Sequence, residues 1–452
     1  MKLKKGVIFV LIVLSLIINI NLIFPEEHQQ NELDKSYSCL EKELGDNCGN
    51  TKSTKQTAFN LLASAYDSNI QKACKLSLNE KKQGVCWGEA NNSQCNIKST
   101  ALATLALNHI GENVDEQVKW LLEKKISNTG LTWFLEIDTN NKSDCTINGK
   151  SIIIEANKKI SGSPPTGLTK AYEDYWFQIN DISKNYTISC NKDFITALIY
   201  QKPGSNVFHV SSDTKSASEF DTIIEKVNSF CLSTSKECDY EGSLWAAIAL
   251  AKEGKDFNHL IPYLTSMSDE AENKKFLSSA FLYILTNSDD YYSELISLQK
   301  NNNYWDESRN KFYDTALAIL SLQSVNSDEI ENSRKYLLSV RKNDGCWQSD
   351  TAFILYAGWP KNPEKISLGT GLSYCEDFGN FCVSIGECNL ANTLDNFYCQ
   401  SSAKICCKNK KQEAICSEKN GIICELNQEC KGDSITASDS NDCCIGDCIE
   451  IE

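Results

Sequence analysis

The sequence lacks the short motifs that identify the common catalytic classes. It contains no Gly-x-Ser-x-Gly elbow, no Walker loop for phosphates and no dinucleotide fingerprint. Its four histidines, His28, His109, His209 and His259, are scattered, and none begins a His-Glu-x-x-His ligand set. Because acid–base and metal chemistry need such residues at fixed spacings, we expect each histidine to be structural and the protein to use no cofactor and no metal.

The chain also has no surplus of positive charge. Its formal net charge is −15 at pH 7. Non-specific binding to nucleic acids or to anionic membranes depends on clusters of basic residues. We therefore expect no nucleic-acid partner, and contact with a membrane only through an N-terminal segment.

Cysteine, in contrast, is abundant, with 22 residues. Such numbers persist as disulfides in an oxidising, extracytoplasmic setting. The N-terminus agrees, since a basic leader precedes an apolar stretch from Gly6 to Phe24. Residues 1–25 are therefore predicted to be a secretory signal peptide or an N-terminal membrane anchor. The apolar stretch is long and no Ala-x-Ala site follows it, which favours an uncleaved anchor over a cleaved signal. In either case the rest of the protein is predicted to be exported, as a secreted or a membrane-anchored protein.

Approximate copies of one helical pattern recur along the chain. In the clearest copy, apolar residues from Tyr313 to Leu320 follow the i, i+3, i+4, i+7 spacing of one helix face. A second helix follows, Asp344-Gly345 ends it, and Trp347 can pack back across the pair. Related copies begin near Lys55, Thr100, Ser243 and Phe276. A repeat that cannot bury its apolar face alone must stack on its neighbours.

These copies share Thr-Ala-x-Ala-x-x-x-Leu, then Trp-Leu-Leu or Tyr-Leu-Leu, then Gly-x-Trp. The pattern resembles the helical-pair repeat of the squalene-cyclase and prenyltransferase superfamily, over about residues 53–125 and 216–358. The resemblance implies an α/α toroid, in which inner and outer helices alternate around a central cavity. The expected fold class is mostly α: an α/α toroid of helical pairs with a β-rich insertion and a small disulfide-rich C-terminal region.

Composition divides the chain into segments. After the N-terminal 1–25 we predict a lead-in at 26–52, a first toroid part at 53–130, a β-rich insertion at 131–212, a second toroid part at 213–360, and cystine-rich modules at 375–410 and 411–452. The insertion is predicted from strand-like runs separated by turn-rich segments. Within it, residues 193–201 are predicted as a helix.

The cysteines before residue 360 suggest five bridges. Four follow from spacing or location: Cys39–Cys48, Cys86–Cys95, Cys145–Cys190 and Cys231–Cys238. The remaining cysteines, Cys74 and Cys346, would then join the first helical pair to the last and close the ring.

The C-terminal region is a separate cysteine-rich unit, with twelve cysteines in the 74 residues from Cys375 to Cys448. Two half-repeats of six cysteines resemble knottin-like modules and predict two three-bridge miniature domains. Six cysteines allow 15 connectivities, and the sequence does not choose among them. Zinc binding is the alternative, but export and the lack of Cys-x2-Cys pairs argue against it.

Carboxylates beside the tryptophan turns are the only catalytic candidates. Toroids also host glycan-cleaving enzymes that use two acids across a groove. The candidate acids are Asp306, Asp314 and Asp350, and the aromatic residues that could stack on a sugar are Trp305, Tyr313 and Trp347. The alternative is that these residues cap helices and fill the core.

The sequons at Asn91, Asn141 and Asn185 predict surface glycosylation.

The sequence thus favours a non-catalytic function: binding or adhesion to a protein, glycan or lipid outside the cell. One alternative is a toroid enzyme acting on a glycan or an isoprenoid. Another is a protease inhibitor that uses the cystine-rich modules, with an exposed loop near residues 431–442.

Overall fold

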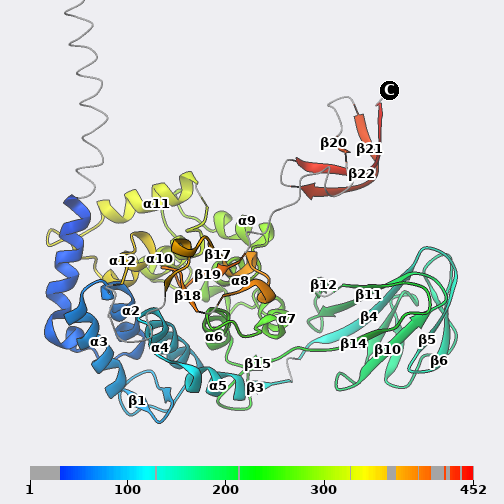
Figure 1. Ribbon diagram of the computed structural model, residues 1–452, viewed down its shortest axis with the longest axis horizontal. Coiled ribbons are helices and arrows are strands. Elements are labelled where there is room, and N and C mark those ends of the chain that lie inside the picture. Colours follow the sequence, from blue (N-terminus) through cyan, green and yellow to red (C-terminus); the bar gives the residue numbers. More distant parts are fainter. Residues whose placement is uncertain are drawn as a thin grey trace, which may run out of the picture.

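The computed structural model describes residues 31–127, 130–211, 214–325, 327–363, 373–394, 396–408, 422–423, 428–437 and 440–450. A helical domain and a β-sandwich make up most of it, and small cystine-rich sheets follow (Figure 1). The predicted signal peptide or anchor at residues 1–25 lies outside the described residues. Within them, no helix is both long and apolar enough to cross a membrane.

Six helices form a closed ring at the centre of the helical domain (Figure 1). They are α2 (Thr54–Ser64), α4 (Ile97–His109), α6 (Tyr240–Lys252), α8 (Ser278–Thr286), α10 (Lys311–Ser321) and α12 (Thr351–Gly358). Each contacts the next, and α12 contacts α2. These helices are apolar around most of their circumference, and every residue of α12 is buried. A helix of this kind is stable only when other elements surround it.

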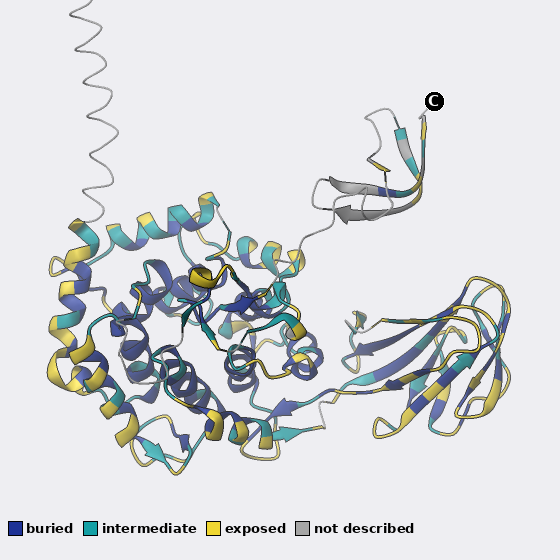
Figure 2. Cartoon of the chain, in the orientation of Figure 1, coloured by how far each residue is buried: buried dark blue, intermediate teal, exposed yellow. Residues whose placement is uncertain are grey.

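A second set of helices lies outside this ring. It comprises α3 (Ser68–Glu80), α5 (Asp115–Glu123), α7 (Ile261–Ser266), α9 (Asp289–Ser297) and α11 (Asp328–Ser339). Most of these helices are amphipathic: α11, for example, buries Ile330, Ser333 and Leu337 and turns other residues to solvent (Figure 2). A small hairpin of β1 (Lys82–Gln83) and β2 (Cys86–Trp87) follows α3.

The β-sandwich is formed by two antiparallel sheets. The first has the order β14 (Ile223–Lys226), β10 (Asn185–Cys190), β5 (Ser143–Ile147), β6 (Lys150–Ile154) and β7 (Ile160–Ser161). The second has the order β12 (His209–Val210), β11 (Phe194–Gln201), β4 (Thr132–Thr139), β9 (Trp176–Ile179) and β8 (Leu168–Ala171), and β13 (Lys215–Ala217) also pairs with β11.

Alternation along the strands builds the core between these sheets. In β4, Trp133, Leu135 and Ile137 point inward and pack with Tyr186 and Ile188 of β10. Phe134, between two inward residues, therefore points to the opposite face of the sheet.

A two-stranded stalk connects the sandwich to the helical domain. It is made by β3 (Lys125–Ile126) and β15 (Cys231–Leu232), which pair antiparallel. Two side-chain contacts add to it: the Tyr200 hydroxyl lies 2.9 Å from Thr265 Oγ1, and Lys202 forms an ion pair with Glu270.

The first cystine-rich module contains β16 (Ser373–Tyr374), β17 (Phe381–Ser384), β18 (Phe397–Tyr398) and β19 (Lys404–Cys407). Three bridges hold it: Cys375–Cys406, Cys382–Cys399 and Cys388–Cys407. In the second module, β20 (Ile422–Ile423), β21 (Gln428–Ala437) and β22 (Ser440–Glu450) form one sheet, in which Cys430 pairs with Cys444. The loop suggested for protease inhibition therefore belongs largely to the β21–β22 hairpin.

The expected fold class is wrong, and so is the resemblance to the squalene-cyclase and prenyltransferase superfamily that implied it. The structure is 40% helix and 24% strand with several antiparallel sheets, so it is a mixed α and β protein and not a mostly α toroid. The insertion continues past residue 212, because β13 and β14 belong to the sandwich and α6 begins only at Tyr240. Residues 193–201 are also not a helix, since β11 is the strand that pairs with β4 over its whole length.

The bridges of the helical domain differ partly from those expected. The structure joins Cys86 to Cys95, Cys145 to Cys190 and Cys231 to Cys238, which are pairs suggested above. The pairs Cys39–Cys48 and Cys74–Cys346 are wrong, because Cys39 bonds to Cys346 and Cys48 to Cys74.

The position of the helical lead-in explains why Cys39 and Cys48 bond to other partners than expected. Residues 31–44 form a helix that packs on the last repeat, where Glu32 pairs with Arg341 and the Tyr37 hydroxyl donates to the Trp359 carbonyl. Cys39 is thereby brought beside Cys346. The described residues contain nine disulfides, which indicate an extracellular protein.

Candidate functional site

The three candidate acids do not form a catalytic pair. Asp314 is fully buried, and its carboxylate accepts hydrogen bonds from the backbone N–H and the hydroxyl of Ser308, both at 2.7 Å. Burial raises the pKa of Asp314, and the bonds from Ser308 oppose that rise. Asp350 precedes α12 and accepts a 2.8 Å bond from Asn310. Asp306 is half-buried, and its backbone carbonyl accepts a bond from Lys300. Asp314 and Asp350 thus hold the loops at the starts of α10 and α12.

The tryptophans beside these acids connect outer to inner helices. The indole N–H groups of Trp87, Trp305 and Trp347 donate to the carbonyls of Leu78, Leu295 and Leu337, at 2.7–2.8 Å. The backbone N–H of each tryptophan donates, at 3.1 Å, to a threonine hydroxyl at the start of the next inner helix. All three indoles are buried, so Trp305 and Trp347 are not available to stack on a sugar.

Aromatic side chains also fill the space between the inner helices. Phe59 of α2 stacks on Phe353 of α12 with centroids 4.1 Å apart. Tyr313 lies 5.3 Å from Phe353, and Trp245 packs on Phe281 at 4.9 Å. Among the described residues, buried aromatic side chains therefore occupy the space between the inner helices.

The first cystine-rich module covers the ends of α4, α6 and α12. Lys252, at the end of α6, donates to the carbonyls of Ser401 and Lys404 at 3.1 and 2.7 Å. The Tyr398 hydroxyl lies 2.9 Å from His109 Nδ1, at the end of α4. Burial lowers the pKa of His109 to about 3 and that of Lys252 to about 8. His109 is therefore neutral and structural, and the module is part of the helical domain.

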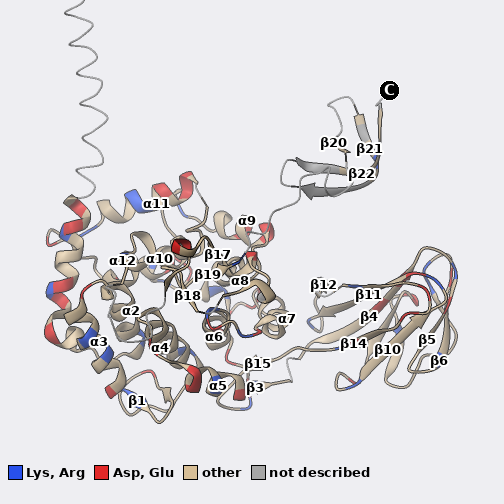
Figure 3. Cartoon of the chain, in the orientation of Figure 1, with Lys and Arg blue, Asp and Glu red and all other residues tan. Residues whose placement is uncertain are grey.

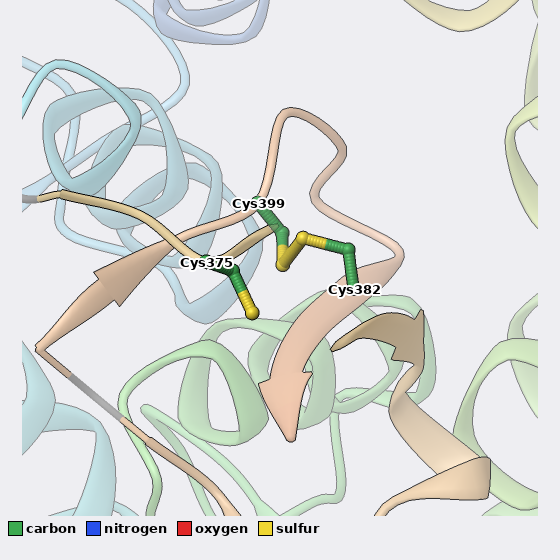
Figure 4. A group of neighbouring side chains, drawn as sticks. All are labelled: Cys375, Cys382 and Cys399. Carbon is green, nitrogen blue, oxygen red and sulfur yellow. A yellow bond between two sulfur atoms is a disulfide. The ribbon is translucent and has the colours of Figure 1, made fainter. Parts of the chain in front are cut away.

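Three cysteine sulfurs of this module lie within 4.8 Å of one another: those of Cys375, Cys382 and Cys399 (Figure 4). Such a cluster would suit zinc only as thiolates. Cys382 is bonded to Cys399, and Cys375 is bonded to Cys406. The cluster is therefore two adjacent disulfides.

A more promising site lies on the outer face of the second sheet of the sandwich. Phe134, Tyr172, Trp176 and Phe208 form one cluster there, which we call the aromatic surface. Tyr172 lies 4.9 Å from Phe208 and 5.1 Å from Trp176, and Trp176 lies 5.3 Å from Phe208, between ring centroids. Phe134 is buried beneath them, Trp176 and Phe208 are partly exposed, and Tyr172 is 45% exposed. An exposed group of large aromatic rings marks an interaction site more often than a chance feature.

Backbone geometry at this surface is unusual. Tyr172, Glu173 and Asp174 have φ values of 50°, 55° and 72° in the turn between β8 and β9. Each non-glycine residue in a left-handed conformation costs about 1–2 kcal/mol. The turn is held by the Ile160 N–H, which donates to the Asp174 carbonyl at 2.8 Å, and by Lys170, which lies 3.4 Å from the Asp174 carboxylate. Strain that the surrounding structure maintains is typical of binding and active sites.

Polar groups border the aromatic surface. The indole N–H of Trp176 donates to Glu136 at 3.1 Å, and the Tyr172 hydroxyl donates to Gln201 at 3.1 Å. These bonds fix the orientation of both rings. In the adjacent turn, the side chain of Glu173 is 82% exposed and that of Asp174 is 50% exposed. Figure 3 shows that the sandwich carries both acidic and basic residues.

Little in the sequence indicates this surface. Its residues come from β4, the β8–β9 turn, β9 and the residue before β12, and only the sheet brings them together. The one available signal was the alternation in β4 and β9, which places Phe134 and Trp176 on the face opposite the core.

The sequons are compatible with glycosylation, since Asn91, Asn141 and Asn185 are all exposed.

No protein family, no curated protein and no solved structure matches the chain. The geometry of the site is therefore the basis for any functional conclusion.

Proposed function

We propose that this extracellular protein binds an uncharged glycan through the aromatic surface and does not transform it. The observation that carries the proposal is the contact of Tyr172, Trp176 and Phe208 outside the sandwich core. The C–H faces of sugar rings are apolar and pack on aromatic rings, while their hydroxyls need polar partners at the edge. Tyrosine and tryptophan supply both an apolar face and a polar group.

Charge favours a neutral ligand. The protein has a net charge of −15, and Glu136 lies at the aromatic surface. In the adjacent turn Glu173 and Asp174 are paired with Lys159 and Lys170, so this turn adds no positive charge that would attract an anion. Like charges would repel an acidic glycan, an anionic lipid or a nucleic acid. An uncharged chain carries no such penalty.

Binding is favoured over catalysis because no pair of free carboxylates accompanies the surface among the residues described. Glu136 accepts a bond from the Trp176 indole, and Glu173 and Asp174 are paired with Lys159 and Lys170. We also propose that residues 1–25 direct export, as a cleaved signal or as an anchor that would keep the glycan-binding domain at the cell surface.

The test is a binding screen of the oxidised ectodomain, residues 26–452, against arrays of neutral and acidic glycans. We expect binding to neutral chains, and we expect Tyr172→Ala to weaken it about tenfold, which corresponds to about 1.4 kcal/mol for one stacking ring. Phe220→Ala is a matched control, since Phe220 is a 71% exposed aromatic residue of the same sandwich outside the aromatic surface. Equal loss in both variants, or binding confined to acidic glycans, would refute the proposal.

A further inference from the structure

A cleft lies between the sandwich and the helical domain. Its volume is about 640 Å³, within the usual range for ligand sites, which often occur between domains. The sandwich contributes residues of β4, β11, β12, β13 and β14, and the helical domain contributes the segment 256–265, Thr286 and Tyr291. The stalk and the Tyr200–Thr265 hydrogen bond connect the same two domains.

Two partly exposed rings of the sandwich, Phe208 and His209, line the cleft. Tyr200 stacks on His209 with centroids 5.2 Å apart and planes inclined by 16°, and Trp133 lies 5.0 Å from Tyr200. Tyr200 and Trp133 are buried, so they hold His209 in place and offer little surface to a ligand. On the helical side, Tyr291, Asn258 and Pro262 face the cleft. Aromatic rings on one wall and a phenol with an amide on the other suit a ligand that has both apolar faces and hydrogen-bonding groups.

Phe208 makes the cleft continuous with the aromatic surface. Its ring contacts Tyr172 and Trp176 on the outer face of the sheet, and the same residue lines the cleft. The next residue, His209, stacks inside the cleft. Phe208 thus borders both the aromatic surface and the cleft.

The cleft also carries balanced charge. Its charged lining residues are two lysines, Lys215 and Lys226, and two acids, Glu225 and Asp256. Lys215 pairs with Glu225 at 2.9 Å. Burial lowers the pKa of His209, and burial with nearby Lys125 lowers that of His259 to about 4, so both imidazoles are neutral at pH 7. This balance matches an uncharged ligand.

We infer that the cleft is the second part of the glycan site, so that a longer neutral oligosaccharide spans the aromatic surface and the cleft and contacts the helical domain through Asn258 and Tyr291. This inference rests on the proposed function. It adds that the ligand is an extended chain, that recognition involves both domains, and that affinity rises with chain length.

The experiment measures affinities of the ectodomain for neutral gluco-, manno-, galacto- and xylo-oligosaccharides of two and six units, by calorimetry. For the wild type we expect the six-unit chain to bind about tenfold more tightly than the two-unit chain. Asn258→Ala and Tyr291→Ala should each lower the affinity for the six-unit chain to nearly that for the two-unit chain. Neither variant should change the affinity for the two-unit chain. Tyr292→Ala is the matched control: it changes the neighbouring tyrosine, which packs on Tyr283 and is not part of the cleft.

The outcomes separate the two proposals. If no oligosaccharide binds, the proposed function and the inference both fall. If disaccharides bind but length gives no gain, or if Tyr292→Ala lowers the ratio as much as Tyr291→Ala, the aromatic surface stands and the role of the cleft is refuted. Thermal unfolding of each variant verifies that the fold is intact.

Discussion

Acid should destabilise this protein through His109, whose ring is buried between the end of α4 and the first cystine-rich module. The ring contacts Tyr356 and Tyr398, and its Nδ1 lies 2.9 Å from the Tyr398 hydroxyl. Burial, helped by nearby Lys252, lowers its pKa from 6.5 to about 3. The native state therefore keeps His109 neutral in a pH range where the unfolded chain binds a proton.

The sign and size of the effect follow from this difference. Well above pH 6.5 His109 is unprotonated in both the native and the unfolded state, so it contributes no pH dependence to the free energy of unfolding. Between pH 6.5 and about 3 the unfolded state binds more protons, and stability falls as the pH falls. At pH 4.5, two pH units below the unfolded pKa, the loss is about 3 kcal/mol, since each unit corresponds to 1.36 kcal/mol.

The assay is denaturant unfolding at pH 7 and pH 4.5, followed by tryptophan fluorescence, because Trp87, Trp245, Trp305 and Trp347 are buried in the helical domain. His109→Gln retains a polar side chain but cannot titrate, so we expect the acid-induced loss to shrink by about 3 kcal/mol relative to the wild type. His209→Gln, at a half-buried histidine of the sandwich, is the control and should retain the loss. An unchanged pH dependence in His109→Gln would refute the reasoning.

Two further predictions concern the helical domain. Thr351→Val removes the hydroxyl that accepts the Trp347 N–H and should lower the free energy of unfolding by about 1–3 kcal/mol, the cost of a buried unsatisfied N–H. Thr104→Val is its control and should cost less, because that hydroxyl bonds only within its own helix; equal losses would count against the tryptophan connection. Removing the Cys39–Cys346 bridge, which spans 307 residues, should lower the melting temperature more than removing Cys231–Cys238, which spans 7. Peptide mapping that recovers Cys39 bonded to Cys48 would contradict this pairing.

The residues of the candidate site were only partly predictable from the sequence. Asp306, Asp314 and Asp350 lie close to tryptophans in the sequence, but closeness in sequence does not show which groups a carboxylate binds. In the structure Asp314 accepts bonds from Ser308, and Asp350 accepts one from Asn310. The aromatic surface was missed because its four rings come from separate strands and turns.

The sequence by itself determined the features that depend on near neighbours along the chain. Apolar spacing predicts α10 and its copies, the Gly-x-Trp turns end the pairs, and cysteine content indicates an extracellular, disulfide-rich protein. Features that depend on contacts between distant residues were decided by the tertiary structure alone. Residues 193–201 were predicted as a helix, but they form strand β11 because they pair with β4 over eight residues. Cys39 forms a disulfide with Cys346 because the lead-in helix packs on the last repeat. Phe208 contacts Tyr172 because the sheet brings distant segments of the chain to one face. Such contacts depend on distances in space, which local residue patterns do not encode.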